Sequence, residues 1–257
     1  QVKAQGVDVI FWMDNSGSIN DPGWDNMTAS TKSIIDQVLG CNPLNRVAVV
    51  HYAGGPYTGV SPGTPKIYIE SDFTSNVTTA KNFVRRGGQP TQGGTHYSTM
   101  GGSDFASEAL QVIGNALDAT ANSNIVSTQK ELTKTANNKL VIFYFTDADR
   151  DYSSSWMVSQ TNTANPFVVY NQFKTDRGAT FVVIKKVSGG PLDVAARETA
   201  AAIASVGGSY NGAVESNAGD PQGSGVKPRK AIISSTLAYQ VELSLRLPLI
   251  SVNLVHR

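Results

Sequence analysis

Two largely apolar stretches, each leading directly to an acidic residue, constrain the fold of this chain more than any other feature. Residues 7–13 read Val-Asp-Val-Ile-Phe-Trp-Met and run into Asp14, and residues 140–145 read Leu-Val-Ile-Phe-Tyr-Phe and lead through Thr146 to Asp147. Apolar runs of this length are typical of strands buried on both faces, as in a parallel sheet covered by helices on both sides. We therefore expect two central strands whose ends carry carboxylates.

Strand and helix patterns alternate along the rest of the chain. The pattern over 104–119 is the most regular, because its apolar residues recur at the spacing of one helix face. Alternation of this kind predicts an α/β fold, doubly wound, with a mostly parallel central sheet flanked by helices in the Rossmann-like manner. The further helices are expected over 24–39, 76–86, 166–176 and 192–206, and the further strands over 46–52, 66–70 (an edge strand) and 180–184.

The length of 257 residues fits one large domain with an appendage. We expect the α/β domain to cover residues 1–229, ending in the Gly- and Pro-rich stretch that precedes residue 230. Residues 230–241 have the pattern of a closing helix, and the alternating leucines that follow predict a C-terminal β extension up to residue 257.

The sequence Asp14-Asn15-Ser16-Gly17-Ser18 follows the first apolar strand and precedes a helix. A carboxylate and two hydroxyls at alternate positions supply hard oxygen atoms, which suit Mg²⁺, and also Mn²⁺ or Ca²⁺, better than zinc. Asp147 ends the other central strand, and two carboxylates a few ångströms apart are unfavourable unless a cation lies between them. The two strand ends therefore predict a divalent metal site. Taken alone, the first motif also fits a simple turn and helix cap.

A third hydroxyl can come from either of two similar loops, Gly93-Gly94-Thr95 and Gly101-Gly102-Ser103. Thr95 follows a glycine pair and has a suitable side chain. Ser103 lies immediately before the helix expected over 104–119. Both remain candidate metal ligands.

These three motifs, in this order, resemble the metal-ion-dependent adhesion site of the von Willebrand factor A and integrin I-domain family, and the resemblance covers roughly residues 6–214. It implies that Ser16, Ser18 and the loop hydroxyl bind the ion directly, and that Asp14 and Asp147 act directly or through water. It also implies that the sixth position accepts a carboxylate from a partner. The chain departs from the family at residue 148, where alanine replaces the usual glycine after Thr146-Asp147.

The resemblance implies a module that binds a protein or matrix ligand presenting a carboxylate and is not an enzyme. The net charge of +1 gives no field for nucleic acid, no apolar stretch is long enough to cross a membrane, and a single cysteine excludes an internal disulfide. We expect an extracellular or cell-surface location and a place within a larger chain.

Two other functions compete with this interpretation. One is an intracellular module of the same family that works in an ATPase or metal-chelatase assembly and uses the same ion differently. The other is a metal-dependent hydrolase, but Ser16 stands where an aspartyl-phosphate enzyme needs its second aspartate, and the Gly-x-Ser-x-Gly pattern of serine hydrolases is missing around it.

Overall fold

The computed structural model describes residues 4–53, 65–85, 106–147, 150–152, 155–156, 167–186, 200, 203–205, 230–234 and 237. The named elements are β1 (Val7–Asp14), α1 (Asp21–Cys41), β2 (Arg46–Ala53), β3 (Lys66–Thr74), α2 (Val77–Lys81), α3 (Ala106–Leu117), β4 (Lys139–Thr146), β5 (Arg150–Tyr152), β6 (Ser155–Trp156), α4 (Phe167–Arg177), β7 (Thr180–Lys186) and β9 (Ala231–Ser234).

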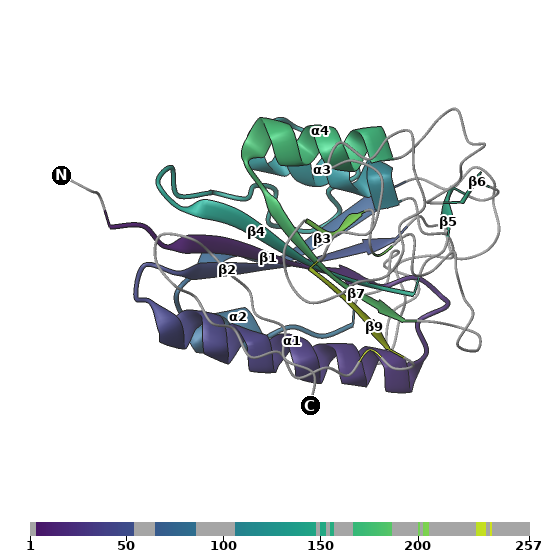
Figure 1. Cartoon of the computed structure of the whole chain (residues 1–257), viewed down its shortest axis with the longest axis horizontal. Coiled ribbons are helices and arrows are strands. Elements are labelled where there is room, and N and C mark those ends of the chain that lie inside the picture. The colour runs from purple at the N-terminus through teal and green to yellow at the C-terminus, as the bar shows by residue number, and fades with distance from the viewer. Residues whose placement is uncertain are drawn as a thin grey trace.

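The main sheet has six strands in the order β3-β2-β1-β4-β7-β9, and β5 pairs with β6 in a small hairpin. All neighbours in the main sheet are parallel except β2 and β3. Helices α1 and α2 cover one face and α3 and α4 cover the other (Figure 1). The predicted doubly wound α/β fold is confirmed, and so is the edge position of β3. Among the described helices, none combines the length and the apolar character that crossing a bilayer requires.

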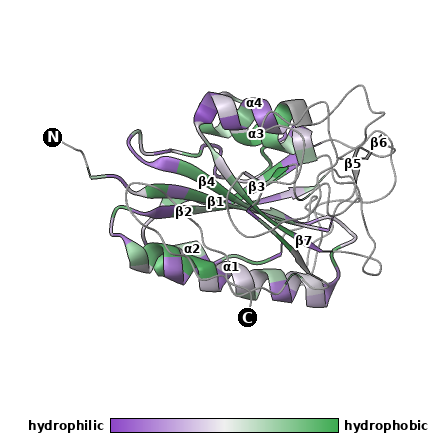
Figure 2. Ribbon diagram, in the orientation of Figure 1, coloured by the Kyte–Doolittle hydropathy of each residue, from purple (hydrophilic) through white to green (hydrophobic). Residues whose placement is uncertain are grey.

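Alternate residues of β1 pack on opposite faces of the sheet. Ile10 and Trp12 join the core that includes α3 and α4, while Val9, Phe11 and Met13 join the core that includes α1 and α2. A strand that needs an apolar side chain on both faces has no room for polar alternation, which explains the continuous run in the sequence. In Figure 2 much of the hydrophobic colour lies on the strands, whereas the helices carry both colours.

Helix α1 begins three residues before the predicted start at Trp24, because its first turn is set by Asn20. The Asn20 side chain accepts a hydrogen bond from the backbone N–H of Gly23 at 2.9 Å, and a proline stands in the first turn. Both are favoured at helix starts. The helix ends at Cys41, whose side chain is exposed.

Helix α2 is much shorter than the predicted helix over 76–86. It spans Val77–Lys81, and the N–H of Asn82 turns back to the carbonyl of Thr79 at 3.3 Å. Its sequence, Val-Thr-Thr-Ala-Lys, is rich in β-branched residues, which favour helix weakly. The chain leaves the helix after Lys81 and buries Phe83 and Arg85.

The helix predicted over 230–241 is wrong at its start, because residues 231–234 form β9 and pair in parallel with β7. The sequence Ala-Ile-Ile-Ser is short and contains two β-branched isoleucines, and Ile232 is buried in the sheet core. This stretch therefore belongs to the main sheet rather than to an appendage. The predicted C-terminal strands beyond residue 237 lie outside the described residues, as does most of the helix predicted over 192–206, of which residues 200 and 203 are helical.

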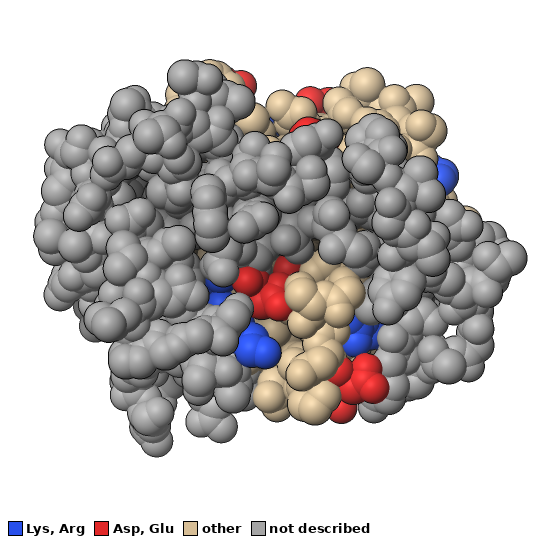
Figure 3. All heavy atoms as spheres, turned by 90° about the vertical axis from the view of Figure 1, so that its right-hand side faces the viewer, with Lys and Arg blue, Asp and Glu red and all other residues tan. Residues whose placement is uncertain are grey.

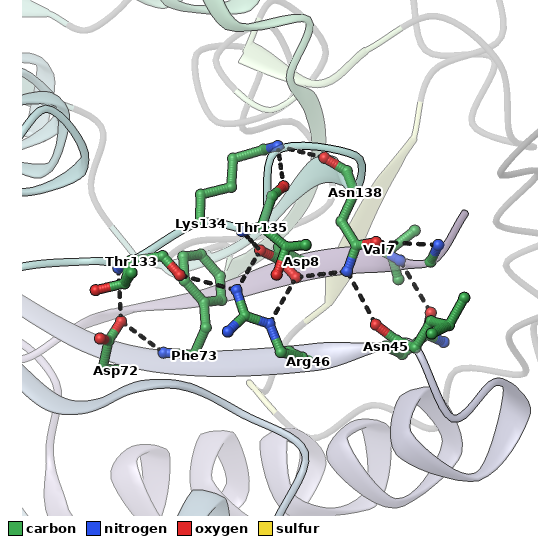
Figure 4. A network of polar contacts seen from close by, with 12 residues as sticks. Val7, Asp8, Asn45, Arg46, Asp72, Phe73, Thr133, Lys134, Thr135 and Asn138 are labelled. Atoms are coloured by element: carbon green, nitrogen blue, oxygen red, sulfur yellow. Dashed lines mark hydrogen bonds and ion pairs between the residues drawn. The ribbon is translucent and has the colours of Figure 1, made fainter. Parts of the chain in front are cut away.

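The end of the sheet where β1 and β4 begin is fastened by a polar network around Asp8 (Figure 4). The buried Asp8 carboxylate accepts hydrogen bonds from the Arg46 guanidinium at 2.8 and 3.3 Å, from the Asn138 amide at 2.8 Å and from the Thr135 backbone N–H at 2.6 Å. A buried charge with this many donors is well satisfied. The opposite end of the same strands carries the predicted metal ligands.

Candidate metal centre

The two predicted acidic strand ends are neighbours in the structure. Strands β1 and β4 pair in parallel, with Met13 opposite Phe145, so Asp14 and Asp147 lie at the same edge of the sheet. The strand order runs outward from β1 through β2 on one side and from β4 through β7 on the other. In open α/β sheets such a reversal leaves a crevice at the carboxyl ends of the strands, where ligands bind.

The turn after β1 brings both serine hydroxyls of the motif towards Asp147. The backbone N–H of Ser16 donates to Asp14 Oδ1 at 2.8 Å, which closes the turn over the strand end. The hydroxyl oxygens of Ser16 and Ser18 are 3.1 Å apart, and the Ser18 hydroxyl donates to Asp147 Oδ1 at 3.0 Å. Four predicted ligands from two distant parts of the chain therefore form one connected cluster.

The second oxygen of Asp14 is held by a chain of buried hydroxyls. Thr146 Oγ1 donates to Asp14 Oδ2 at 2.8 Å and lies 3.2 Å from the hydroxyl of Tyr52. That hydroxyl in turn lies 2.5 Å from the hydroxyl of Tyr144. Because both Asp14 oxygens have partners, the orientation of this fully buried carboxylate is fixed by the fold.

The Asp147 carboxyl is strongly perturbed by its position. Burial, and then the nearby carboxylate of Asp14, raise its pKa to about 7, although the Ser18 hydrogen bond and the charge of Lys185 act in the opposite direction. A carboxyl with such a raised pKa is in an environment that disfavours its negative charge. A cation bound at this carboxylate pair would stabilise the negative charge of Asp147 and so lower its pKa.

The donor set fits a hard divalent cation. Within the described part of the chain, histidine, cysteine and carboxylate side chains form no group of three that can hold a metal, which argues against a zinc site there. The cluster instead offers two carboxylates and two hydroxyls, the oxygen donors that Mg²⁺, Mn²⁺ and Ca²⁺ take. The two candidates for a further hydroxyl ligand, Thr95 and Ser103, lie outside the described residues.

The family model of the von Willebrand factor type A domain matches residues 8–184, which include both acidic strand ends. The chain belongs to this family. No curated protein matches the chain.

Several solved structures are similar to this chain at low sequence identity. Proximal thread matrix protein 1 from the mussel byssus is similar at a TM-score of 0.50 and 12% identity, over 90% of this chain and 44% of that one. The pilus adhesin SpaC from Lactobacillus rhamnosus GG is similar at a TM-score of 0.49 and 12% identity, over 92% of this chain and 29% of that one. Manganese-loaded TRAP protein from Plasmodium vivax is similar at a TM-score of 0.41 and 13% identity, over 72% of this chain and 59% of that one. This chain thus spans less than half the length of the mussel protein.

A buried lysine lies next to the acidic pair of this A domain, and sequence reasoning missed it. Lys185 of β7 stands opposite Thr146 of β4 and is fully buried. Its ammonium donates to the backbone carbonyls of Asp147 at 3.0 Å and Lys186 at 2.9 Å. Despite this positive charge, the pKa of Asp147 stays raised. The sequence signal that could have identified it is a charged residue at the end of an otherwise apolar strand.

The face that carries the site is mixed in charge. Figure 3 looks at the end of the A domain where β1 and β4 finish, and shows acidic atoms near the centre of the described surface with basic atoms beside them. Trp24, which follows the first motif in the sequence, is 3% exposed and packs in the core.

Proposed function

We propose that this A domain is a protein-binding module that depends on a divalent cation held by Asp14, Ser16, Ser18 and Asp147. The observation that carries the proposal is the connected cluster in which Ser18 joins the turn after β1 to the end of β4. The raised pKa of Asp147 supports it, because carboxylates placed side by side under burial gain most from a cation. Mg²⁺ is the proposed ion, and Mn²⁺ or Ca²⁺ fit the same donors.

The ligand types also indicate what the ion would bind. A divalent cation with few anionic ligands attracts a further anion, and a carboxylate from an acidic side chain of a partner protein is the proposed one. Asp14 and Asp147 are each engaged by hydrogen bonds from the chain itself, so these residues hold the site in shape rather than reaching for the partner.

We propose that the domain binds its partner without catalysing a reaction. Among the described residues, the Ser16 hydroxyl is paired with the Ser18 hydroxyl and not with a general base. His51 lies in the core against Trp24 and Tyr68 at ring-centroid distances of 5.1 and 6.2 Å, and near Glu70 at 3.5 Å. A panel of phosphate and ester substrates with Mg²⁺ tests this point, and metal-dependent turnover that Asp14→Ala abolishes would contradict it.

We further propose that the domain is one module of a larger extracellular or cell-surface protein. The low charged fraction of 16% and the many Asn, Thr and Ser residues support this location. Antibody labelling of intact producing cells, compared with permeabilised cells, tests it. Labelling that requires permeabilisation would contradict it and would favour the intracellular module.

The proposed function is tested with Mn²⁺ as a reporter ion. We expect one Mn²⁺ to bind to the chelator-treated domain and to enhance the relaxation of water protons, because water fills the position kept for the partner. Acetate or a short Glu-containing peptide should lower that enhancement by displacing the water, and an amide analogue should not. If Mn²⁺ binds but no carboxylate lowers the relaxation enhancement of water protons, the proposed binding of a partner carboxylate is contradicted. If Mn²⁺ does not bind, the proposed metal site itself is contradicted.

A further inference from the structure

Arg85 is a buried cation that the predicted site did not include. It follows α2, and its side chain is only 1% exposed. A guanidinium has five N–H donors in a fixed planar arrangement and stays charged, so burying one requires several acceptors around it. The positions of those acceptors show what Arg85 does in this fold.

Among the described residues, the acceptors of Arg85 lie in the turn between β1 and α1 and at the first residue of α1. Its Nε donates to the side-chain oxygen of Asn15 at 2.9 Å, and its Nη2 donates to the carbonyl of Ser16 at 3.4 Å and to the carbonyl of Ile19. Its Nη1 lies 3.4 Å from Asp21 Oδ1 at the start of α1. One side chain thus contacts the turn before, at and after the two serines.

The rest of the guanidinium environment is equally specific. The Arg85 Cζ lies 5.4 Å from the centre of the Trp24 ring, a distance at which cation–π attraction operates. Burial lowers the pKa of Arg85, and the carboxylates of Asp21, Asp14 and Asp25 act in the opposite direction. These contacts fix the Arg85 side chain, and they also link the backbone and side chains of the turn to one another.

The turn also has contacts of its own, among them the bond from the Ser16 backbone N–H to Asp14 Oδ1 at 2.8 Å. Its backbone is fixed by the bonds from Asn15 N–H to the Tyr52 carbonyl at 2.9 Å and from Ile19 N–H to the Ser16 carbonyl at 3.2 Å. The Ser16 carbonyl is shared between Ile19 and Arg85, and the carbonyl of Ile19 faces Arg85. Rotation of these peptide units would turn the Ser16 and Ser18 hydroxyls away from Asp147.

We propose that Arg85 is a positioning residue that holds the turn between β1 and α1 in its ion-binding shape before the ion arrives. The inference rests on the proposed metal function. Arg85 also stands immediately before residues 86–105, the stretch of chain that carries both candidate loop ligands, Thr95 and Ser103.

A purely electrostatic role of Arg85 predicts the opposite change in metal affinity from a positioning role. If Arg85 acted only through its charge, removing that charge would strengthen the binding of a divalent cation, because like charges repel. If it acts by positioning, removing the guanidinium weakens binding even though a repulsive charge is lost. Arg85→Lys keeps the charge and most of the length but loses the planar donors. Arg85→Met loses both the charge and the planar donors.

The experiment compares Arg85→Lys, Arg85→Met and a matched control, Arg177→Met. Arg177 also bonds to a carboxylate, that of Asp118 at 2.7 and 2.9 Å, and also lies over an aromatic ring, that of Phe173 at 5.1 Å, but it joins α3 and α4. Two quantities are measured on each folded variant. One is hydrogen exchange of the amides of residues 15–24 in chelator, and the other is the Kd for MnCl₂ by calorimetry.

We expect faster exchange in residues 15–24 in both Arg85 variants and Mn²⁺ binding weaker by about 10-fold or more, as for other residues that orient metal ligands. The control should match the wild type in both quantities. Unchanged exchange, or faster exchange with unchanged or tighter Mn²⁺ binding, would overturn the role of Arg85 while the metal function stands. A wild type that binds no Mn²⁺ would overturn the metal function together with this inference. That result differs from the one that overturns the role of Arg85 alone.

Discussion

The hydroxyl of Ser18 donates to Oδ1 of Asp147 at 3.0 Å, although 129 positions separate the two residues in the chain. This contact joins the turn after the first strand of the sheet to the end of the fourth. It places a hydroxyl where a hard cation needs one, beside a carboxyl whose charge the fold disfavours.

The substitution Ser18→Ala should weaken metal binding while leaving the stability of the fold nearly unchanged. Ser18 is exposed, so its loss should change the free energy of unfolding of the metal-free protein by no more than about 0.5 kcal/mol. Mn²⁺ binding should weaken at least tenfold, because a direct ligand is gone. Calorimetric titration and urea unfolding in chelator measure the two quantities, with the exposed Ser123→Ala as control. Equal Mn²⁺ affinity in Ser18→Ala and wild type would remove Ser18 from the site.

The stability of the metal-free protein should fall as pH rises towards 7. The pKa of Asp147 is about 7 in the folded state against 3.8 for an ordinary aspartate. Between these values the folded state binds more protons than the unfolded state, so the free energy of unfolding decreases with increasing pH. Urea unfolding in chelator across this range should show the decline.

Asp147→Asn is the control for the pH effect, because its amide does not titrate. Its metal-free stability should depend less on pH than that of the wild type. Mg²⁺ should remove most of the decline in the wild type and leave the variant unchanged, since a ligand stabilises the state that binds it. An identical pH dependence in both proteins would show that another group is responsible.

Thr146→Val tests whether the buried hydroxyl chain orients Asp14. The substitution keeps the shape of the side chain but removes the donor to Asp14 Oδ2. We expect Mn²⁺ binding to weaken by about 10-fold, in the range for lost partners of metal ligands. Thr31→Val is the matched control, because Thr31 is also fully buried and its hydroxyl donates to the Met27 carbonyl at 2.8 Å within α1. A similar Mn²⁺ affinity in the two variants would contradict the role of Thr146.

Asp8→Ala should have the reverse effect, with loss of stability but not of metal binding. It removes the acceptor of the Arg46, Asn138 and Thr135 bonds at the far end of the sheet. Breaking a buried pair on one side costs about 3 kcal/mol or more, and chemical unfolding should show a loss of this size. Below the unfolding transition, the Mn²⁺ affinity should stay that of the wild type. A weaker affinity there would mean that the two ends of the sheet are coupled.

The sequence was sufficient to predict the central strands of the sheet and the meeting of their acidic ends. Burial on both faces forces an unbroken apolar run, so β1 and β4 were recognisable, and parallel pairing places Asp14 and Asp147 at one edge. The site motif was recognisable because Ser16 and Ser18 follow their strand at short range. The ligation of an ion by these residues stays a prediction.

The parts that sequence reasoning missed depend on contacts between distant segments. The pattern over 76–86 indicated a helix, yet α2 ends at Lys81 and the chain beyond it places Arg85 against the turn of Ser16. The short stretch 231–234 was taken as the start of a helix because its role as a strand depends on pairing with β7. Lys185 meets the Asp147 carbonyl only because β7 lies beside β4.

The most direct test of the metal site is a crystal of this domain grown with MnCl₂ and measured for anomalous scattering at the manganese absorption edge. We predict one strong peak within bonding distance of the Ser16 and Ser18 hydroxyls and beside the carboxylates of Asp14 and Asp147. A map without that peak, in which water or the ammonium of Lys185 occupies the space between the two carboxylates, would contradict the account.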